Sequence, residues 1–147
     1  MNFTVKNVER IWLNLPFREV PRRNMIRELP HWTIIELCRV TLENGVVGVG
    51  ETMPFYTHWP VTDEAVGRAT GRCATELMWD DALGHGLQMA LFDAVGRTMD
   101  VPVHRLLGRK VRNEVMVSFW SIEMSPQDWL LECREALRRG YTSYKFK

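Results

Sequence analysis

The sequence predicts an α+β fold that passes, near its C-terminal end, into a strand–helix–strand unit with parallel strands. Two observations carry this prediction. Residues 33–42 and 46–51 are β-rich runs on either side of Asn44-Gly45, a strong hairpin signature whose turn positions are expected to take positive φ. Residues 114–147 then follow the pattern strand, helix, strand, which implies a parallel pair joined by a right-handed crossover.

A further strand is predicted before the hairpin. Residues 3–15 mix β-branched and aromatic side chains with polar ones, and Pro16 ends the run. These three runs predict a three-stranded antiparallel sheet. Two polar, proline-containing segments, residues 18–30 and 51–60, are predicted to be loops, and long loops in compact domains are often functional.

The middle of the chain is predicted to be helical. Thr62 followed by acidic residues resembles an N-cap, which favours a helix over residues 63–77. The strongest helix is expected at residues 86–98, and a short one at 103–107. One apolar stripe of the strongest helix combines four side chains at helical spacing: Leu87, Leu91, Ala94 and Val95.

The C-terminal unit contains strands at residues 114–120 and 142–147 around a helix at 126–139. Ser125 before Pro126 is a typical helix start. The stripe expected to be buried comprises three side chains at helical spacing: Leu130, Cys133 and Leu137.

Composition restricts the function classes. The chain has 147 residues, 46% of them hydrophobic and 25% charged, as in ordinary globular proteins. A formal net charge of +1 argues against a nucleic-acid partner. No apolar stretch is long enough to span a membrane, no secretory signal is recognised, and three cysteines form no CxxC pair. We therefore expect a cytoplasmic protein with neither nucleic acid nor membrane as partner.

Lys145 and Lys147 are the candidate catalytic residues. They share one face of the last predicted strand, while Tyr144 and Phe146 share the other. Two ammonium groups held together repel each other, so one of them could lose its proton and act as a base. The alternative is that these are exposed strand lysines that prevent aggregation.

Residues 87–108 carry a resemblance to a known family. Ala90-Leu91-Phe92-Asp93 leads to Gly96-Arg97, and Pro102-Val103 leads to Leu106-Leu107-Gly108. This pattern resembles the mandelate racemase / muconate lactonizing enzyme group of the enolase superfamily. The hairpin and the Lys-x-Lys ending are similar to that group as well, so the resemblance runs over nearly the whole chain.

The resemblance implies two domains. Residues 1–110 would be an α+β capping domain, with the three-stranded antiparallel sheet followed by helices. Residues 111–147 would be the first βαβ of an α/β, TIM-type barrel. A complete barrel needs roughly 250 residues, so the barrel is expected to be incomplete in this chain.

The resemblance also implies a reaction. Enzymes of the group remove the α-proton of a small carboxylate substrate and form an enediolate stabilised by Mg²⁺, whether they are racemases, epimerases, dehydratases or cycloisomerases. Lys147 would be the general base and Lys145 its charge partner. The metal ligands of the group come from the third, fourth and fifth barrel strands, so we expect none in this chain and no activity from it alone.

Two capping loops, residues 18–32 and 52–60, would by the same analogy close over the substrate. They contain four candidate substrate contacts: His31, Trp32, Tyr56 and His58. A different class of function remains open. The chain could be a truncated, non-catalytic α+β module that acts by self-association or partner binding, and a homo-oligomer is an open alternative for the enzyme too.

Overall fold

A computed structural model describes residues 1–56 and 59–147, which form two compact units. The sheet unit comprises residues 1–15 and 34–110, and the βαβ unit comprises residues 16–33 and 111–147. The predicted domain boundary between residues 110 and 111 stays a prediction. The structure adds that residues 16–33, which lie between two strands of the sheet in sequence, group with the C-terminal segment.

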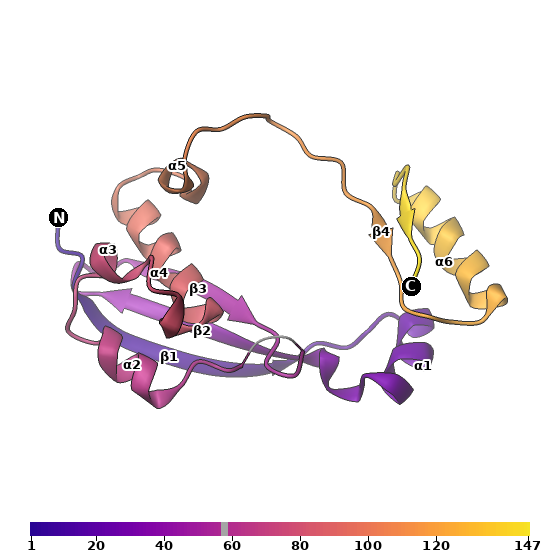
Figure 1. Ribbon diagram of the computed structural model, residues 1–147, viewed down its shortest axis with the longest axis horizontal. Helices are drawn as coiled ribbons and strands as arrows, with labels where there is room; N and C mark the ends of the chain where they lie inside the picture. Colours follow the sequence, from indigo (N-terminus) through magenta and orange to yellow (C-terminus); the bar gives the residue numbers. More distant parts are fainter. Residues whose placement is uncertain (57–58) are drawn as a thin grey trace. The chain divides into compact units, whose positions relative to one another are not determined.

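The sheet unit contains the predicted antiparallel sheet. Its strands are β1 (Val5–Asn14), β2 (Ile34–Leu42) and β3 (Val47–Thr52), in the order β1-β2-β3 (Figure 1). Both pairs are antiparallel, and Cys38 of β2 faces Arg10 of β1 and Gly50 of β3. The three predicted strands are therefore confirmed.

The hairpin turn differs from the expected two-residue type. Only Gly45 takes a positive φ, +85°, whereas Asn44 is not among the described residues with positive φ. The Gly45 N–H donates to the carbonyl of Leu42, and the Leu42 N–H donates to the carbonyl of Val46. This is a three-residue loop with glycine in the left-handed position, and the side chain of Asn44 accepts from the Val46 N–H instead.

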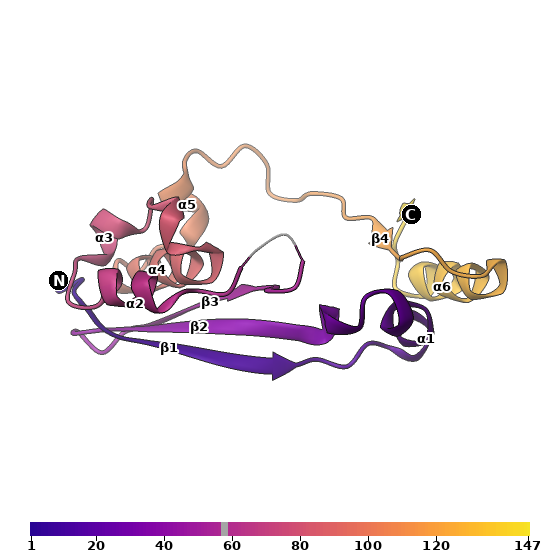
Figure 2. The same cartoon turned by 60° about the horizontal axis from the view of Figure 1, so that its bottom comes forward.

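Helix α4 (His85–Thr98) covers one face of the sheet, and α2 (Asp63–Ala69) and α3 (Ala74–Leu77) lie on the same side (Figure 2). All four side chains of its predicted stripe are fully buried. Glycines in β3 permit the close approach, because a Cβ at Gly50 would lie 2.6 Å from the backbone nitrogen of Ala90. Two short helices complete the unit, η2 (Asp81–Leu83) and α5 (Val103–Leu107).

The single helix predicted over residues 63–77 was wrong. Thr62 caps α2 as expected, its side chain accepting from the Ala65 N–H. The helix ends at Ala69 because the following residues pair with β1: the Val5 N–H donates to the Arg72 carbonyl at 2.8 Å, and the Gly71 N–H to the Val5 carbonyl at 2.8 Å. Backbone pairing with the sheet therefore replaces one helical turn.

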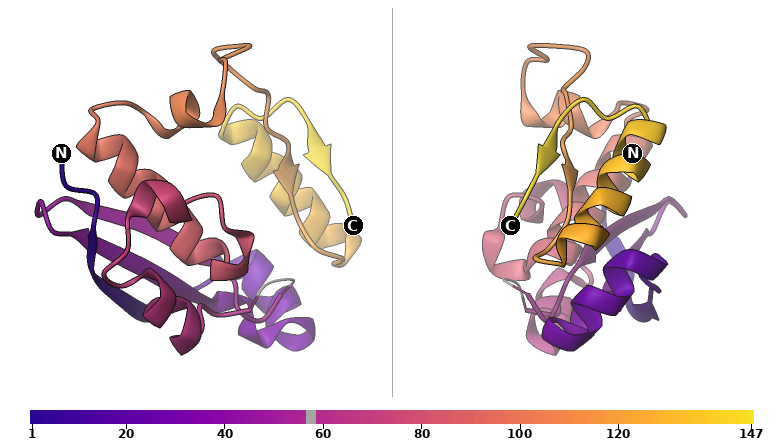
Figure 3. Two further views of the ribbon diagram at one scale, coloured as in Figure 1. Left: turned by 60° about the vertical axis from the view of Figure 1, so that its left-hand side comes forward. Right: turned by 90° about the vertical axis from the view of Figure 1, so that its right-hand side faces the viewer.

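The βαβ unit contains β4 (Phe119–Trp120), α6 (Pro126–Arg138) and β5 (Tyr144–Lys145). The strands pair in parallel, with Phe119 opposite Tyr144, and α6 runs alongside them (Figure 3). The parallel βαβ prediction is confirmed. The strands are much shorter than the predicted ranges 114–120 and 142–147.

The same unit contains a helix where a loop was predicted. Residues 18–30 include α1 (Glu19–Glu28), followed by the short helix η1 (Pro30–Thr33). The loop prediction relied on the proline and the charges of this segment. Pro21 lies in the first turn, where a missing N–H is tolerated. Arginine and glutamate are also good helix formers.

The buried stripe predicted for α6 was wrong. Leu130 and Leu137 are exposed, at 53% and 72%, and the buried residues of the helix are Asp128, Glu132 and Ala136. Carboxylates are buried at these positions because arginines of residues 16–33 pair with them. In the described part of the chain, no helix has the length and apolar character needed to cross a membrane.

Candidate functional site

Lys147 lies just beyond β5, the second strand of the parallel pair. Tyr144 and Phe146 stack with ring centroids 4.6 Å apart, as expected for side chains two positions apart on one face of an extended chain. Lys145 and Lys147 are both exposed. The roles assigned to the two lysines stay predictions.

Lys147 lines a cavity of about 650 Å³ within the βαβ unit, and Lys145 is not among the lining residues. The remaining lining comes from two segments, the C-terminal part of α1 with Leu29 and the connection from β4 to α6. Its members are Asn24, Arg27, Glu28, Leu29, Ile122, Glu123, Met124 and Ser125. This size lies within the range of small-molecule pockets.

The cavity is lined by both apolar and polar side chains. Ile122 and Met124 are buried together with Met25 of α1, and Trp32 and Trp129 pack against this group. Amide, hydroxyl and charged groups of Asn24, Ser125 and Arg27 also line the cavity. Polar groups beside apolar ones are typical of sites that orient a small organic molecule.

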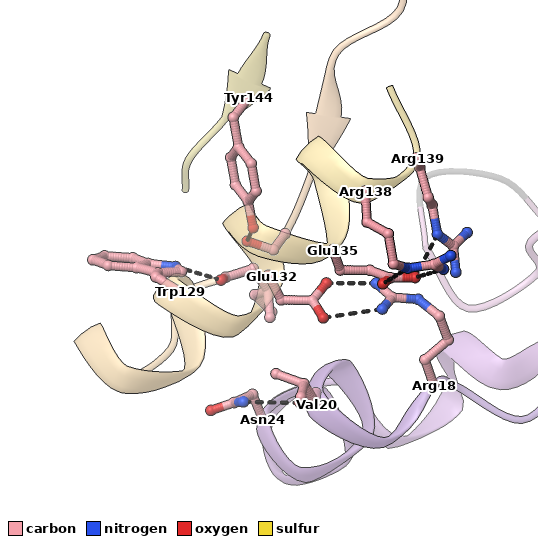
Figure 4. Close-up of polar contacts among 11 residues, drawn as sticks. Arg18, Val20, Asn24, Trp129, Glu132, Glu135, Arg138, Arg139 and Tyr144 are labelled. Atoms are coloured by element: carbon pink, nitrogen blue, oxygen red, sulfur yellow. Dashed lines mark hydrogen bonds and ion pairs between the residues drawn. The ribbon is translucent and has the colours of Figure 1, made fainter. Parts of the chain in front are cut away.

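Arg18, immediately before α1, pairs with Glu132 of α6 in a two-pronged contact. Its Nη1 and Nη2 donate to Oε1 and Oε2 at 3.0 and 2.5 Å (Figure 4). Glu132 is only 1% exposed. The guanidinium also lies 5.4 Å from the ring centroid of Phe119 in β4. The hydrogen bond to Glu132 raises the pKa of Arg18, so this arginine stays charged.

Arg23 of α1 makes the equivalent contact with Asp128. Arg23 Nε donates to Oδ2 at 3.0 Å, and Nη2 donates to Oδ1. Asn24 Nδ2 donates to the same Oδ2 at 2.8 Å. The hydrogen bonds from Arg23 and then from Asn24 lower the pKa of Asp128. This carboxylate also lies in the first turn of α6, where negative charge is favourable.

The structure assigns the described substrate-contact candidates to both units. His31 and Trp32 belong to η1 in the βαβ unit, where Trp32 stacks on Trp120 with ring centroids 6.2 Å apart. Tyr56 is in the sheet unit and is about half exposed. His58 lies outside the described residues. None of the three described side chains lines the Lys147 cavity.

Several cavity residues were not predicted from the sequence as site residues, among them Asn24, Arg27 and Ser125. The available signal was the unusual density of arginine in residues 18–27. Ser125 was recognised only as a helix cap, a role it also fulfils by accepting from the Asp128 N–H.

A magnesium site is not formed by the residues described. Among them, no three side chains of His, Cys, Asp or Glu gather so that they could hold a metal ion. Two carboxylates line the cavity, those of Glu28 and Glu123, and Glu28 is paired with Arg27. We therefore derive no chemical step through a metal.

Comparison with known proteins gives a consistent fold. No protein-family model matches the sequence. A D-gluconate/D-galactonate dehydratase of Picrophilus torridus is 23% identical over 140 residues, which cover 80% of this chain and 36% of that protein. The chain thus spans about a third of the length of this curated relative.

Solved structures match almost the whole chain. The 2-chloromuconate cycloisomerase of Rhodococcus opacus 1CP has a TM-score of 0.72 at 22% identity, covering 97% of this chain and 43% of that one. A mandelate racemase/muconate lactonizing enzyme of Roseiflexus sp. has a TM-score of 0.74 at 18% identity, covering 99% and 43%. The predicted resemblance is confirmed at the level of the fold: this chain has the fold of part of the mandelate racemase / muconate lactonizing proteins.

Proposed function

We propose that this chain supplies the Lys-x-Lys portion of an enolase-superfamily active site, and that the whole protein removes the α-proton of a small carboxylate substrate. One observation carries the proposal: Lys147, at the carboxyl end of a parallel strand pair, lines a cavity that combines polar and apolar side chains. Active sites of α/β barrels lie at the carboxyl ends of their strands.

The proposed step is a proton transfer. The neutral amine of Lys147 accepts the proton from the α-carbon, and the electron pair of the broken C–H bond moves into the carboxylate to form an enediolate. The resemblance implies that Lys145 is the charge partner of Lys147 in this step. The enediolate then collapses by reprotonation or by loss of a leaving group, which are the outcomes of isomerases and dehydratases respectively.

Magnesium belongs to this proposal through the resemblance alone. When bound, it would supply positive charge to the enediolate oxygens. The described residues form no site for it. We accordingly expect the 147-residue chain by itself to show no turnover, and the complete protein to require further carboxylates.

Isotope exchange tests the proposed function. The complete protein encoded by the open reading frame around this sequence would be incubated with Mg²⁺ and a panel of small carboxylates in D₂O, and deuterium at the α-carbon followed by NMR. Lys147→Ala is expected to lower the exchange rate at least 10³-fold, whereas Lys6→Ala, a substitution in the sheet unit, serves as the matched control. Exchange that survives Lys147→Ala would contradict the assignment of the base.

A second candidate function, self-association without catalysis, is favoured by one observation. Three consecutive side chains before β4, Val115, Met116 and Val117, are each more than 60% exposed. Short strands with open edges beside apolar surface are a known route to pairing with another chain. Sedimentation of the chain over a range of concentrations tests this candidate, which predicts a dimer that Val117→Lys weakens.

A further inference from the structure

The C-terminal part of α1 forms one wall of the Lys147 cavity, yet the helix itself contributes only Met25 and the partly buried Val20 to the apolar cluster of this unit. It has ten residues, of which only Met25 is buried. Helices of this length are marginal in water without tertiary packing. Arg18, its N-cap, makes no capping hydrogen bond through its side chain. The position of the wall must therefore depend on other interactions.

Those interactions are ionic and are directed at a single neighbour, α6. Arg18 donates two hydrogen bonds to Glu132. Arg23 donates two to Asp128, and Asn24 donates a third to Asp128. Arg18 and Arg23 lie five residues apart, and so span more than one turn of helix. Two pairs at separate points hold both the position and the rotation of α1.

The buried carboxylates favour a single docked position of α1. Asp128 and Glu132 are charged groups withdrawn from water, and burying a charge is costly unless it is paired. Removing either arginine would leave a buried carboxylate without its cation in the docked state. The helix is therefore docked in the pose in which both guanidinium groups reach their partners.

We propose that Arg18 and Arg23 are positioning residues, which act through Glu132 and Asp128 to hold α1 as a wall of the Lys147 cavity. Asn24 connects the two roles, because it both donates to Asp128 and lines the cavity. The link to substrate rests on the proposed function. The link between the ion pairs and the cavity does not.

The test uses the 147-residue chain and two readouts that need no turnover. Hydrogen exchange reports on the α1 amides. The rate at which acetic anhydride modifies Lys147 relative to Lys145, followed by mass spectrometry, reports on the cavity. Lys145 is the internal standard because it is exposed nearby on the chain but does not line the cavity.

Three variants separate positioning from general damage. Arg23→Asp is expected to speed exchange of the α1 amides at least tenfold and to raise the Lys147/Lys145 ratio at least threefold. Arg22→Asp makes the same charge change at an exposed position of the same helix and should leave both values within twofold. Combining Arg23→Asp with Asp128→Arg should restore both values toward those of the unmodified chain.

The proposal is overturned if Arg23→Asp leaves the α1 exchange rate and the Lys147/Lys145 ratio within twofold of the unmodified chain. It is also overturned if the double variant Arg23→Asp with Asp128→Arg behaves like Arg23→Asp alone. Should Arg23→Asp also unprotect the amides of α6, the conservative Asp128→Asn variant decides by the same criteria, since it removes charge but keeps the shape of the side chain. Failure of the isotope-exchange test would leave these readouts unaffected, so the two proposals fail separately.

Discussion

The two units of this molecule are stabilised by different kinds of interaction. The core of the sheet unit is a group of mainly aliphatic side chains from the sheet, α4 and the shorter helices, with no buried member more than 3% exposed. The buried group of the βαβ unit contains Met25, Ile122 and Met124, with aromatic rings partly buried around it. In addition, two buried carboxylates of this unit are paired with arginines.

The two units therefore have different sources of stability. Aliphatic packing carries no charge and so does not depend on protonation. The unfolding free energy lost when a buried side chain is truncated increases with the volume removed. Ion pairs depend on the charge of both partners and on geometry. The sheet unit should therefore respond to changes in side-chain volume, and the βαβ unit to changes in charge.

The largest effect is expected from a leucine truncation in the sheet unit. Leu91→Ala removes a side chain of α4 that is 0% exposed, and should lower the free energy of unfolding of that unit by about 3 kcal/mol. Leu137→Ala on α6 removes a side chain that is 72% exposed and should cost no more than about 0.5 kcal/mol. Hydrogen exchange of the β2 and α6 amides measures the two values; equal losses would end the distinction between the units.

Substituting two glycines by alanine is expected to give smaller effects on stability, and the two effects should have opposite signs. Gly50→Ala would drive a Cβ into the backbone of α4 and should destabilise the sheet unit by about 2 kcal/mol. Gly67→Ala adds the same methyl group to α2, where nothing lies within 4 Å, and should stabilise it by about 0.5 kcal/mol. Denaturant-dependent hydrogen exchange of β3 compares them. A tolerated Gly50→Ala would mean that α4 does not pack on β3 this closely.

The smallest and most local effect is expected from acid. Because the pKa of Asp128 is lowered in the folded chain, its pairing contributes fully above its usual pKa of about 3.9 and is lost as the pH falls through the lowered value. We expect the α1 amides to lose protection below about pH 4, before those of β2. Exchange rates corrected for the intrinsic pH dependence test this.

The Asp128→Asn variant is the control for the acid experiment. It should show weakened α1 protection already at neutral pH and no further loss that can be assigned to residue 128 on acidification. Simultaneous loss of protection in α1 and β2, at one pH and in both proteins, would show that the two units respond to acid as one.

Much of the sheet unit could be predicted because its signals are local. Gly45 marked the hairpin, and the spacing of Leu87 and Leu91 marked the buried face of α4. The break between α2 and α3 could not be predicted, because it depends on backbone hydrogen bonds to β1, nearly seventy residues earlier in the chain.

The candidate site divides in the same way. Lys147 was identified from a pattern three residues long together with a resemblance. Asn24 and Arg27 were missed because residues 18–30 resemble a loop in composition, and α1 forms in contact with α6, more than a hundred residues later. No local rule connects Arg23 to Asp128.

The strands, the strongest helices, the parallel βαβ and the lysine pair could be read from local patterns, because periodicity and turn chemistry act between residues close together in the chain. The burial of Asp128 and Glu132 on α6, in place of Leu130 and Leu137, depends on contacts with a distant segment. Each of these two carboxylates meets a guanidinium group, which offsets the cost of burying its charge, and the arginines come from a distant segment of the chain. The pairing that shapes the Lys147 cavity is therefore a property of the folded chain.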